Sequence, residues 1–103
     1  MRQQVVSQTG VGSSASIPMN LDSNPFNVGF GVVVTGTVTY TVQHTFDNPW
    51  TTANPVWFDH PTIAAKVSVN ADGNYAFPVA AIKVVVTAGA GTAALTVIQS
   101  GIA

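Results

Sequence analysis

The chain has 103 residues and no cysteine, and only 7% of its residues are Asp, Glu, Lys or Arg, against about 25% in ordinary soluble domains. Its length suits one domain with a core of its own, and the lack of cysteine excludes disulfides and thiolate metal sites. The net charge of −1 argues against nucleic-acid binding, which depends on clustered Lys and Arg.

The low charge favours a subunit whose outer surface is partly covered by neighbours, because a free and concentrated monomer usually keeps a more charged surface. A soluble protein present at low concentration is the alternative interpretation. No apolar run approaches the ~20 residues of a membrane helix. The first ten residues, MRQQVVSQTG, lack the apolar stretch of a secretory signal, so no signal peptide is expected.

Residues 1–13 are expected to form an N-terminal arm or an edge strand, ahead of a single β-sandwich domain over residues 14–103. The first segment has little apolar periodicity and so gives few reasons to pack on the sandwich. An arm that binds a partner would be disordered in the free protein and ordered on that partner, whereas the alternative is a short strand over residues 3–9. Its candidate interface residues are Arg2, Val5 and Val6.

Residues 28–46 alternate between apolar and polar side chains with a period of two, which is typical of β-strands. The segment is longer than an ordinary strand, so it is expected to be a hairpin with Val34-Thr35-Gly36 as its loop. Gly36 would then have a positive φ, and Phe30 would lie opposite Tyr40. A strand that bends at Gly36 and crosses between two sheets is the alternative.

Residues 47–61, DNPWTTANPVWFDHP, form the one long irregular stretch and contain three prolines. Its aromatic side chains have three possible roles: they can stack on sugar rings, anchor a protein interface, or close one end of the core as a lid. The candidates are the same for all three roles, namely Trp50, Trp57 and Phe58.

Two more hairpins are predicted from the same alternation, each with glycine in its turn. One joins residues 63–69 to residues 75–77, and the other joins residues 82–86 to residues 93–97. The turn of the first is Ala71-Asp72-Gly73, and the turn of the second is Ala88-Gly89-Ala90-Gly91 or its inner pair alone.

Together these segments predict an all-β fold, an antiparallel β-sandwich that is jelly-roll-like, with seven or eight short strands and frequent turn signals. No segment sustains the 3.6-residue period of a helix. The pattern fits jelly-roll and immunoglobulin-like connectivities equally well.

The ionisable residues form no recognisable catalytic constellation. His44 lies in the core-facing phase of its strand, where a histidine bonded to a backbone group is more common than a catalytic base. Asp59 and His60 are adjacent, so their side chains diverge in an extended chain. Asp47 shares their loop, but the spacing of the three matches no metal motif. The sequence therefore predicts no enzyme, no cofactor and no metal site, and a hydrolase that uses Asp59 and His60 is a minor alternative.

A longer pattern runs through two segments, NPFNVGFGVVVTGTVTYTVQHTFDNP (residues 24–49) and DGNYAFPVAAIKVVVTAGAGTAALTVIQ (residues 72–99). It consists of an N-P-F-N-V opening, a Val-rich G-T-V-T-Y-T-V-Q ribbon, a Trp-containing loop, and F-P followed by a Gly-turned hairpin ending in V-I-Q. Over about residues 14–99 this pattern resembles small virion proteins of tailed bacteriophages.

The resemblance implies a non-enzymatic virion subunit, of the capsid decoration (cement) type that stabilises the head shell. Its partners would be the major capsid protein or other virion subunits, and itself as a dimer or trimer, with no nucleic acid and no membrane. Its location would be the virion, after assembly in the host cytoplasm. A tail-fibre or spike module that binds host-surface glycans is one alternative, and a head–tail or tail structural component is another.

Overall fold

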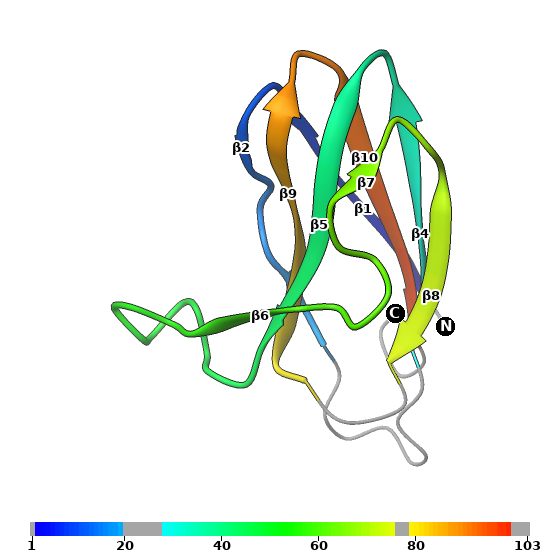
Figure 1. Ribbon diagram of the computed structural model, residues 1–103. Helices are drawn as coiled ribbons and strands as arrows, with labels where there is room; N and C mark the ends of the chain where they lie inside the picture. Colours follow the sequence, from blue (N-terminus) through cyan, green and yellow to red (C-terminus); the bar gives the residue numbers. More distant parts are fainter. Residues whose placement is uncertain (1, 20–27, 76–78, 100–103) are drawn as a thin grey trace.

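The computed structural model describes residues 2–19, 28–75 and 79–99, which fold into two antiparallel β-sheets packed face to face (Figure 1). The described residues form ten strands and no helix, so the predicted β-sandwich is confirmed. Val and Thr dominate the strands, since side chains branched at Cβ pack well on a pleated surface.

The first sheet has four strands in the order β1-β10-β4-β8. Neighbouring strands pair antiparallel without a shift in register, so that Val6 lies opposite Leu95 and Leu95 lies opposite Val32. The bounds of the strands are β1 (Arg2–Thr9), β10 (Thr92–Gln99), β4 (Val28–Thr35) and β8 (Ala71–Tyr75).

The second sheet is built on two long strands, β9 (Ala81–Gly89) and β5 (Val38–Thr45), which pair with each other around one register shift. Each outer strand of this sheet is broken into two pieces. The pieces next to β9 are β2 (Gly12–Ser13) and β3 (Ile17–Pro18), and the pieces next to β5 are β6 (Trp57–Asp59) and β7 (Lys66–Val67).

The connections make this sandwich a jelly roll. A short turn joins each strand of the first sheet to the strand at the same position in the second sheet: β1 to β2, β10 to β9, β4 to β5, and β8 to β7. Four β-arches are therefore stacked side by side, with all four turns at one end of the sandwich (Figure 1). With each broken strand counted once, this is the order of an eight-stranded jelly roll, and the immunoglobulin-like alternative does not fit.

Two of the three predicted hairpins are wrong for one shared reason, which is that the chain crosses to the other sheet at the predicted turn. β4 and β5 lie in different sheets, so Phe30 is not paired with Tyr40. The alternative, a crossing at Gly36, is correct, and the φ of Gly36 is positive as predicted, at +80°. β9 and β10 likewise lie in different sheets. The apolar side chains alternate in the same way whether two consecutive strands pair within one sheet or face each other from two sheets, so the sequence pattern does not distinguish a hairpin from an arch.

The prediction around Asp72 and Gly73 fails more completely. Both residues lie inside β8, where Gly73 is opposite Phe30 of β4, rather than in a turn. The apolar residues of segment 63–69 were expected to share one buried face. Ile63 is buried, but Val67 and Val69 are each exposed by half or more. Phe77 lies outside the described residues.

Residues 2–9 are an edge strand rather than a separate arm. β1 pairs with β10 over eight positions, and the inner side chain of Val6 packs against the core. Of the two predicted alternatives, an arm or an edge strand, the structure contains the edge strand, because alternate residues of this polar segment supply an inner face. The largest fully buried side chains of the core are Tyr40, Tyr75, Ile63, Ile82, Leu95, Val28, Val32, Val38, Val42, Val79 and Val84.

Candidate functional site

The most distinctive surface feature is a loop that projects sideways from the sandwich between β5 and β6 (Figure 1). We call residues 46–56 the projecting loop. It lies at the end of the molecule opposite the four arch turns (Figure 1). This is the irregular, aromatic stretch that the sequence pattern singled out.

Polar groups clasp the projecting loop at its base. The buried hydroxyl of Thr45 donates to the carbonyl oxygen of Val56 (2.8 Å) and accepts from the backbone nitrogen of Asp47 (3.1 Å). The carboxylate of Asp47 in turn accepts from the backbone nitrogen of Val56 (2.9 Å). These bonds hold the two ends of the loop together.

The tip of the loop is also ordered by local hydrogen bonds. The side-chain oxygen of Asn48 accepts a hydrogen bond from the backbone nitrogen of Trp50 (2.9 Å). The backbone carbonyl oxygen of Asn48 accepts one from the backbone nitrogen of Thr52 (2.8 Å). Such Asx-type turns explain why Asp and Asn, with Pro49 between Asn48 and Trp50, form a defined structure here. Trp50 is therefore presented from a preformed turn.

Several large apolar side chains on and beside the loop face solvent. Trp50 and Val56 are each 58% exposed, Phe46 is 57% exposed and Phe58 is 47% exposed. Phe46 and Phe58 meet edge to face with ring centroids 5.8 Å apart, and Phe58 stacks on His44 at 5.9 Å. Trp50 does not serve as a lid over the core, whereas Phe58 partly covers the ring of His44.

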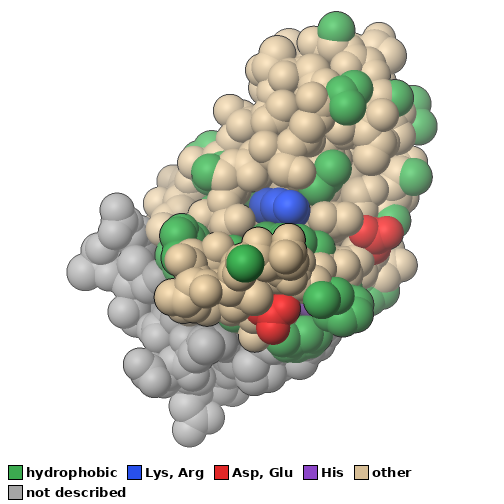
Figure 2. Space-filling model, turned by 90° about the vertical axis from the view of Figure 1, so that its left-hand side faces the viewer, with side chains coloured by type: hydrophobic (Ala, Val, Ile, Leu, Met, Phe, Trp, Pro, Cys, Tyr) green, Lys and Arg blue, Asp and Glu red, His purple; other side chains and the backbone are tan. Residues whose placement is uncertain are grey.

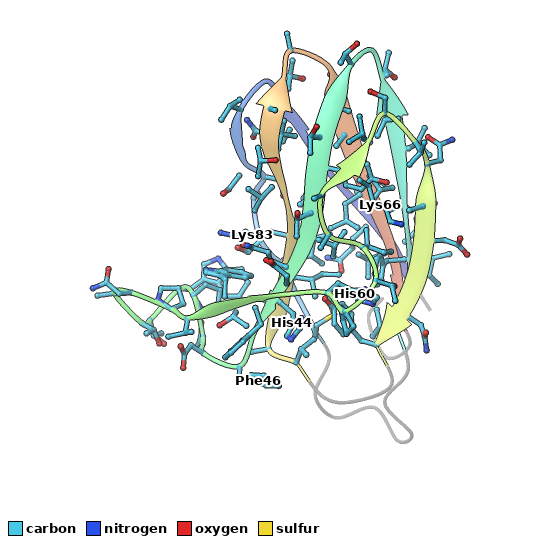
Figure 3. All side chains as sticks on the ribbon, viewed as in Figure 1. His44, Phe46, His60, Lys66 and Lys83 are labelled. Atoms are coloured by element: carbon cyan, nitrogen blue, oxygen red, sulfur yellow. The ribbon has the colours of Figure 1, made fainter. Side chains whose placement is uncertain are left out.

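Trp57 differs from the other loop aromatics because a cation covers its ring. The ammonium of Lys83, on β9, lies 4.1 Å from the ring centroid of Trp57 (Figure 3). Partial burial lowers the pKa of Lys83, and the cation–π contact stabilises its charged form. One face of Trp57 is thus occupied by the protein itself.

The surface around the loop carries little charge. On the face drawn in Figure 2, acidic and basic side chains occur only at isolated places among uncharged polar groups and backbone. An electrostatic site for a strongly charged ligand needs clustered charge of one sign, and this face does not offer it.

Buried ionisable rings lie behind the loop. The Nδ1 atom of His44 is hydrogen-bonded to the hydroxyl of Tyr75 at 2.9 Å, so this partner of His44 is a side chain rather than the predicted backbone group. Burial lowers the pKa of His44, with the charge of His60 acting in the same direction and that of Asp59 opposing it. Burial also raises the pKa of the Tyr75 hydroxyl. His44 is 6% exposed and Tyr75 is fully buried, so neither ring is accessible to a substrate.

His60 has a structural role. Its Nδ1 atom accepts hydrogen bonds from the backbone nitrogens of Thr62 and Ile63, each at 3.2 Å, which places the proton on Nε2, 3.4 Å from the carbonyl oxygen of Asn74. These bonds turn the chain so that Ile63 enters the core. Asp59 instead accepts from the Gln43 amide at the surface (2.8 Å), so the two neighbours diverge as predicted.

The described part of the chain contains no group of three or more His, Asp or Glu side chains placed to hold a metal ion. It also contains no helix long and apolar enough to cross a membrane. An open depression of about 270 Å³ lies on the other sheet, between β4 and β8. Asp72 is its one ionisable lining residue, so it offers no nucleophile with a base.

The six predicted interface residues do not converge. Trp50, Trp57 and Phe58 lie on or beside the projecting loop, whereas β1 lies at the diagonally opposite edge of the sandwich. On β1, Val5 is exposed, Val6 points to the core, and the side chain of Arg2 lies outside the described residues. The sequence analysis did not include Phe46 among the interface residues, because Phe46 continues the alternation of residues 28–46 at a position expected to face the core.

Comparisons of the chain with protein-family models, with characterised proteins and with solved structures each gave no match.

Proposed function

We propose that this chain is a non-enzymatic structural subunit of a bacteriophage virion, specifically a capsid decoration protein that binds the head shell through the projecting loop. The observation that carries the proposal is the set of apolar side chains held in solvent on that loop. Its partner is the major capsid protein or another virion subunit, and its location is the virion.

The loop has the properties of an interface anchor. Interface hot spots are enriched in aromatic side chains that fill pockets of the partner, and Trp50 and Phe46 supply such side chains on the projecting loop. The clasp at Asp47 and Thr45 lowers the conformational entropy that binding removes. Burying the exposed part of these rings on a partner removes apolar surface from water and so stabilises the complex.

Composition supports an assembled subunit as well. A chain with 7% charged residues lacks the charged surface that keeps concentrated monomers apart. In a symmetric particle, many weak contacts add up, so each copy needs only a modest interface. Jelly rolls occur in capsid proteins and in lectins alike, so the fold is compatible with this function without selecting it.

The test is binding of purified variants to shells that lack this protein. The double substitution Phe46→Ala and Trp50→Ala is expected to weaken binding by about tenfold or more, or at least ~1.4 kcal/mol. Val11→Ala is the matched control, because Val11 is an exposed apolar residue in the turn between β1 and β2, at the opposite end of the sandwich. Wild-type affinity in the double variant would overturn the assignment of the loop, and failure of the wild type to bind shells would overturn the function.

A tail-fibre or spike module that binds host-surface glycans is a second candidate, favoured by the exposure of Trp50. Against it, Lys83 occupies one face of Trp57, which leaves a single well-exposed indole for stacking on a sugar. Glycan-array binding that disappears in Trp50→Ala would favour this candidate. A head–tail or tail structural component would use the same loop on another virion partner.

A further inference from the structure

The four edges of the two sheets differ in how they are protected from pairing with another chain. Natural proteins protect edges with short strands, prolines, charges or irregularities. The β2–β3 edge is short and contains Pro18, the β6–β7 edge is interrupted around Ile63, and β8 has five residues including Asp72. β1 has eight residues, no proline and no register shift, and Arg2 is its one charged residue.

The hydrogen bonds of β1 identify the backbone groups on its outer edge. The backbone nitrogen of Gly10 donates to the carbonyl oxygen of Gly91 (3.0 Å), so this pair belongs to the hydrogen-bonded class of antiparallel pairs. Because the classes alternate along a ladder, the even-numbered residues of β1 bond to β10. The residues whose N–H and C=O groups point to the outer edge are Gln3, Val5, Ser7 and Thr9.

We propose that this edge pairs with the same edge of a second copy of the chain, antiparallel about a two-fold axis. Two four-stranded sheets then join into one continuous sheet across the dimer. Among the described residues, no strand occupies this edge, since β10 is the one strand that pairs with β1. The inference concerns the free protein in solution and does not rest on the proposed function.

One register places the outward backbone groups of the two copies opposite each other. With Val6 opposite Val6 of the second copy, Val5 lies opposite Ser7 and Gln3 lies opposite Thr9. The outward groups at Val5 and Ser7 form the centre of this ladder, because these residues flank the pair on the two-fold axis. At the end of the ladder, the carbonyl oxygen of Thr9 also accepts a bond from the Gln8 side chain (3.2 Å). The edge is therefore self-complementary, as a two-fold interface requires.

Side chains and charge also favour a second copy as the occupant. Val6 points to the core on each copy, so the two valines extend one core into the other across the axis. Arg2 falls opposite Gly10 of the second copy, so the one charged residue of β1 meets no like charge on the facing strand. No repulsive element of the kind that blocks edge pairing is present on this strand.

Molar mass in solution tests the proposal, measured by light scattering and sedimentation from about 10 µM to about 1 mM, the range in which small interfaces associate. The wild type is expected to approach twice the monomer mass of 10.6 kDa. Ser7→Pro removes an outward N–H without removing a bond to β10, and is expected to stay monomeric. Ser7→Thr keeps the N–H and is expected to dimerise. A monomeric wild type, a dimeric Ser7→Pro variant or a trimer would overturn the proposal.

Amide hydrogen exchange in the unsubstituted protein gives a second test that does not depend on a variant folding. The amides of Val5 and Ser7 are expected to exchange at least about tenfold more slowly at high concentration than after dilution, because dimerisation buries them. The amide of Val6, which bonds to β10, is expected to stay protected at both concentrations. A dimer in which Val5 and Ser7 exchange at the same rate as in the monomer would place the interface elsewhere.

Discussion

Gly73 and Gly29 lie on neighbouring strands, β8 and β4, and have different structural roles. A Cβ atom on Gly73 would lie 3.1 Å from Cδ1 of Ile63 and 3.2 Å from Cζ of Phe30, whereas nothing lies within 4 Å of a Cβ on Gly29. Gly73 therefore makes room for core side chains. The Asp-Gly pair that predicts a turn in the sequence is used here for packing.

We predict that Gly73→Ala lowers the free energy of unfolding by about 1–3 kcal/mol, the usual effect of overpacking. Gly29→Ala, the matched control, is expected to raise it by about 0.5–1 kcal/mol, because alanine loses less backbone entropy in a strand. Urea denaturation of both variants measures the difference. Equal effects at the two positions would contradict the packing role of Gly73.

The burial of His44 makes stability depend on pH. Its pKa in the folded protein is lowered from 6.5, first by burial and then by the charge of His60. Below about pH 6.5 the unfolded chain therefore binds this proton more readily than the folded one, so the stability contributed by neutral His44 is present above that pH and is lost as the pH falls.

The urea midpoint is accordingly expected to fall between about pH 7.5 and about pH 5.5. In His44→Gln, which keeps a polar group near Tyr75 and removes the titration, the fall is expected to be smaller. Midpoints measured by intrinsic fluorescence at both pH values check this. A wild-type midpoint that stays constant over this range would show that His44 does not destabilise the fold on protonation.

At the scale of elements, the alternation of side chains predicts where the long strands lie and which faces they bury, but not which strands pair. Val32 and Val38 flank the turn at Gly36 with the same apolar phase that a hairpin would require. In the structure they face one core from two sheets. Pairing is decided by contacts between segments that are distant in the sequence, such as β4 and β10. The alternation within one segment does not predict these contacts.

The arch turn between β4 and β5 depends on glycine. Gly36 has a φ of +80°, a conformation that a β-branched residue adopts only with strain. Gly36→Val is therefore expected to lower the free energy of unfolding by about 1–2 kcal/mol or more. Thr35→Val, one residue earlier and exposed on a strand, is the control and is expected to change it by less than about 0.5 kcal/mol. Similar losses in the two variants by urea denaturation would contradict the requirement for glycine.

The projecting loop is predicted to depend on its clasp for order rather than for global stability. Asp47→Ala removes the acceptor for the backbone nitrogen of Val56, so the amide of Val56 is expected to exchange about tenfold faster. The free energy of unfolding is expected to fall by only about 0.5–1.5 kcal/mol. Hydrogen exchange and urea denaturation measure the two effects, with Asp72→Ala as an exposed control. Unchanged exchange at Val56 would show that the clasp does not order the loop.

At the scale of the whole molecule, the sequence predicted part of the candidate site. Trp50 and Phe58 stand out because they are large aromatics in an irregular, proline-rich stretch. Phe46 escaped notice because β5 ends at Thr45 and the next core-phase residue emerges into solvent. The contact between Lys83 and Trp57 could not be predicted from the sequence either, since it depends on the pairing of β5 with both β6 and β9.

The proposed function and the proposed dimer assign different partners to the two sides of the molecule. The projecting loop would contact the shell, and β1, at the diagonally opposite edge, would contact a second copy. The two contacts therefore do not compete for the same surface. A bound dimer would carry two loops, and this bivalence strengthens attachment to a symmetric shell without further contacts.

The central claim, that this chain is a capsid decoration protein, is tested most directly by electron cryomicroscopy of phage particles that contain the chain. The account predicts many copies of the jelly roll on the outer surface of the head, with the projecting loop turned toward the shell and Trp50 buried there. A few copies confined to the tail, or copies on the head whose loop points away from the shell, would contradict it.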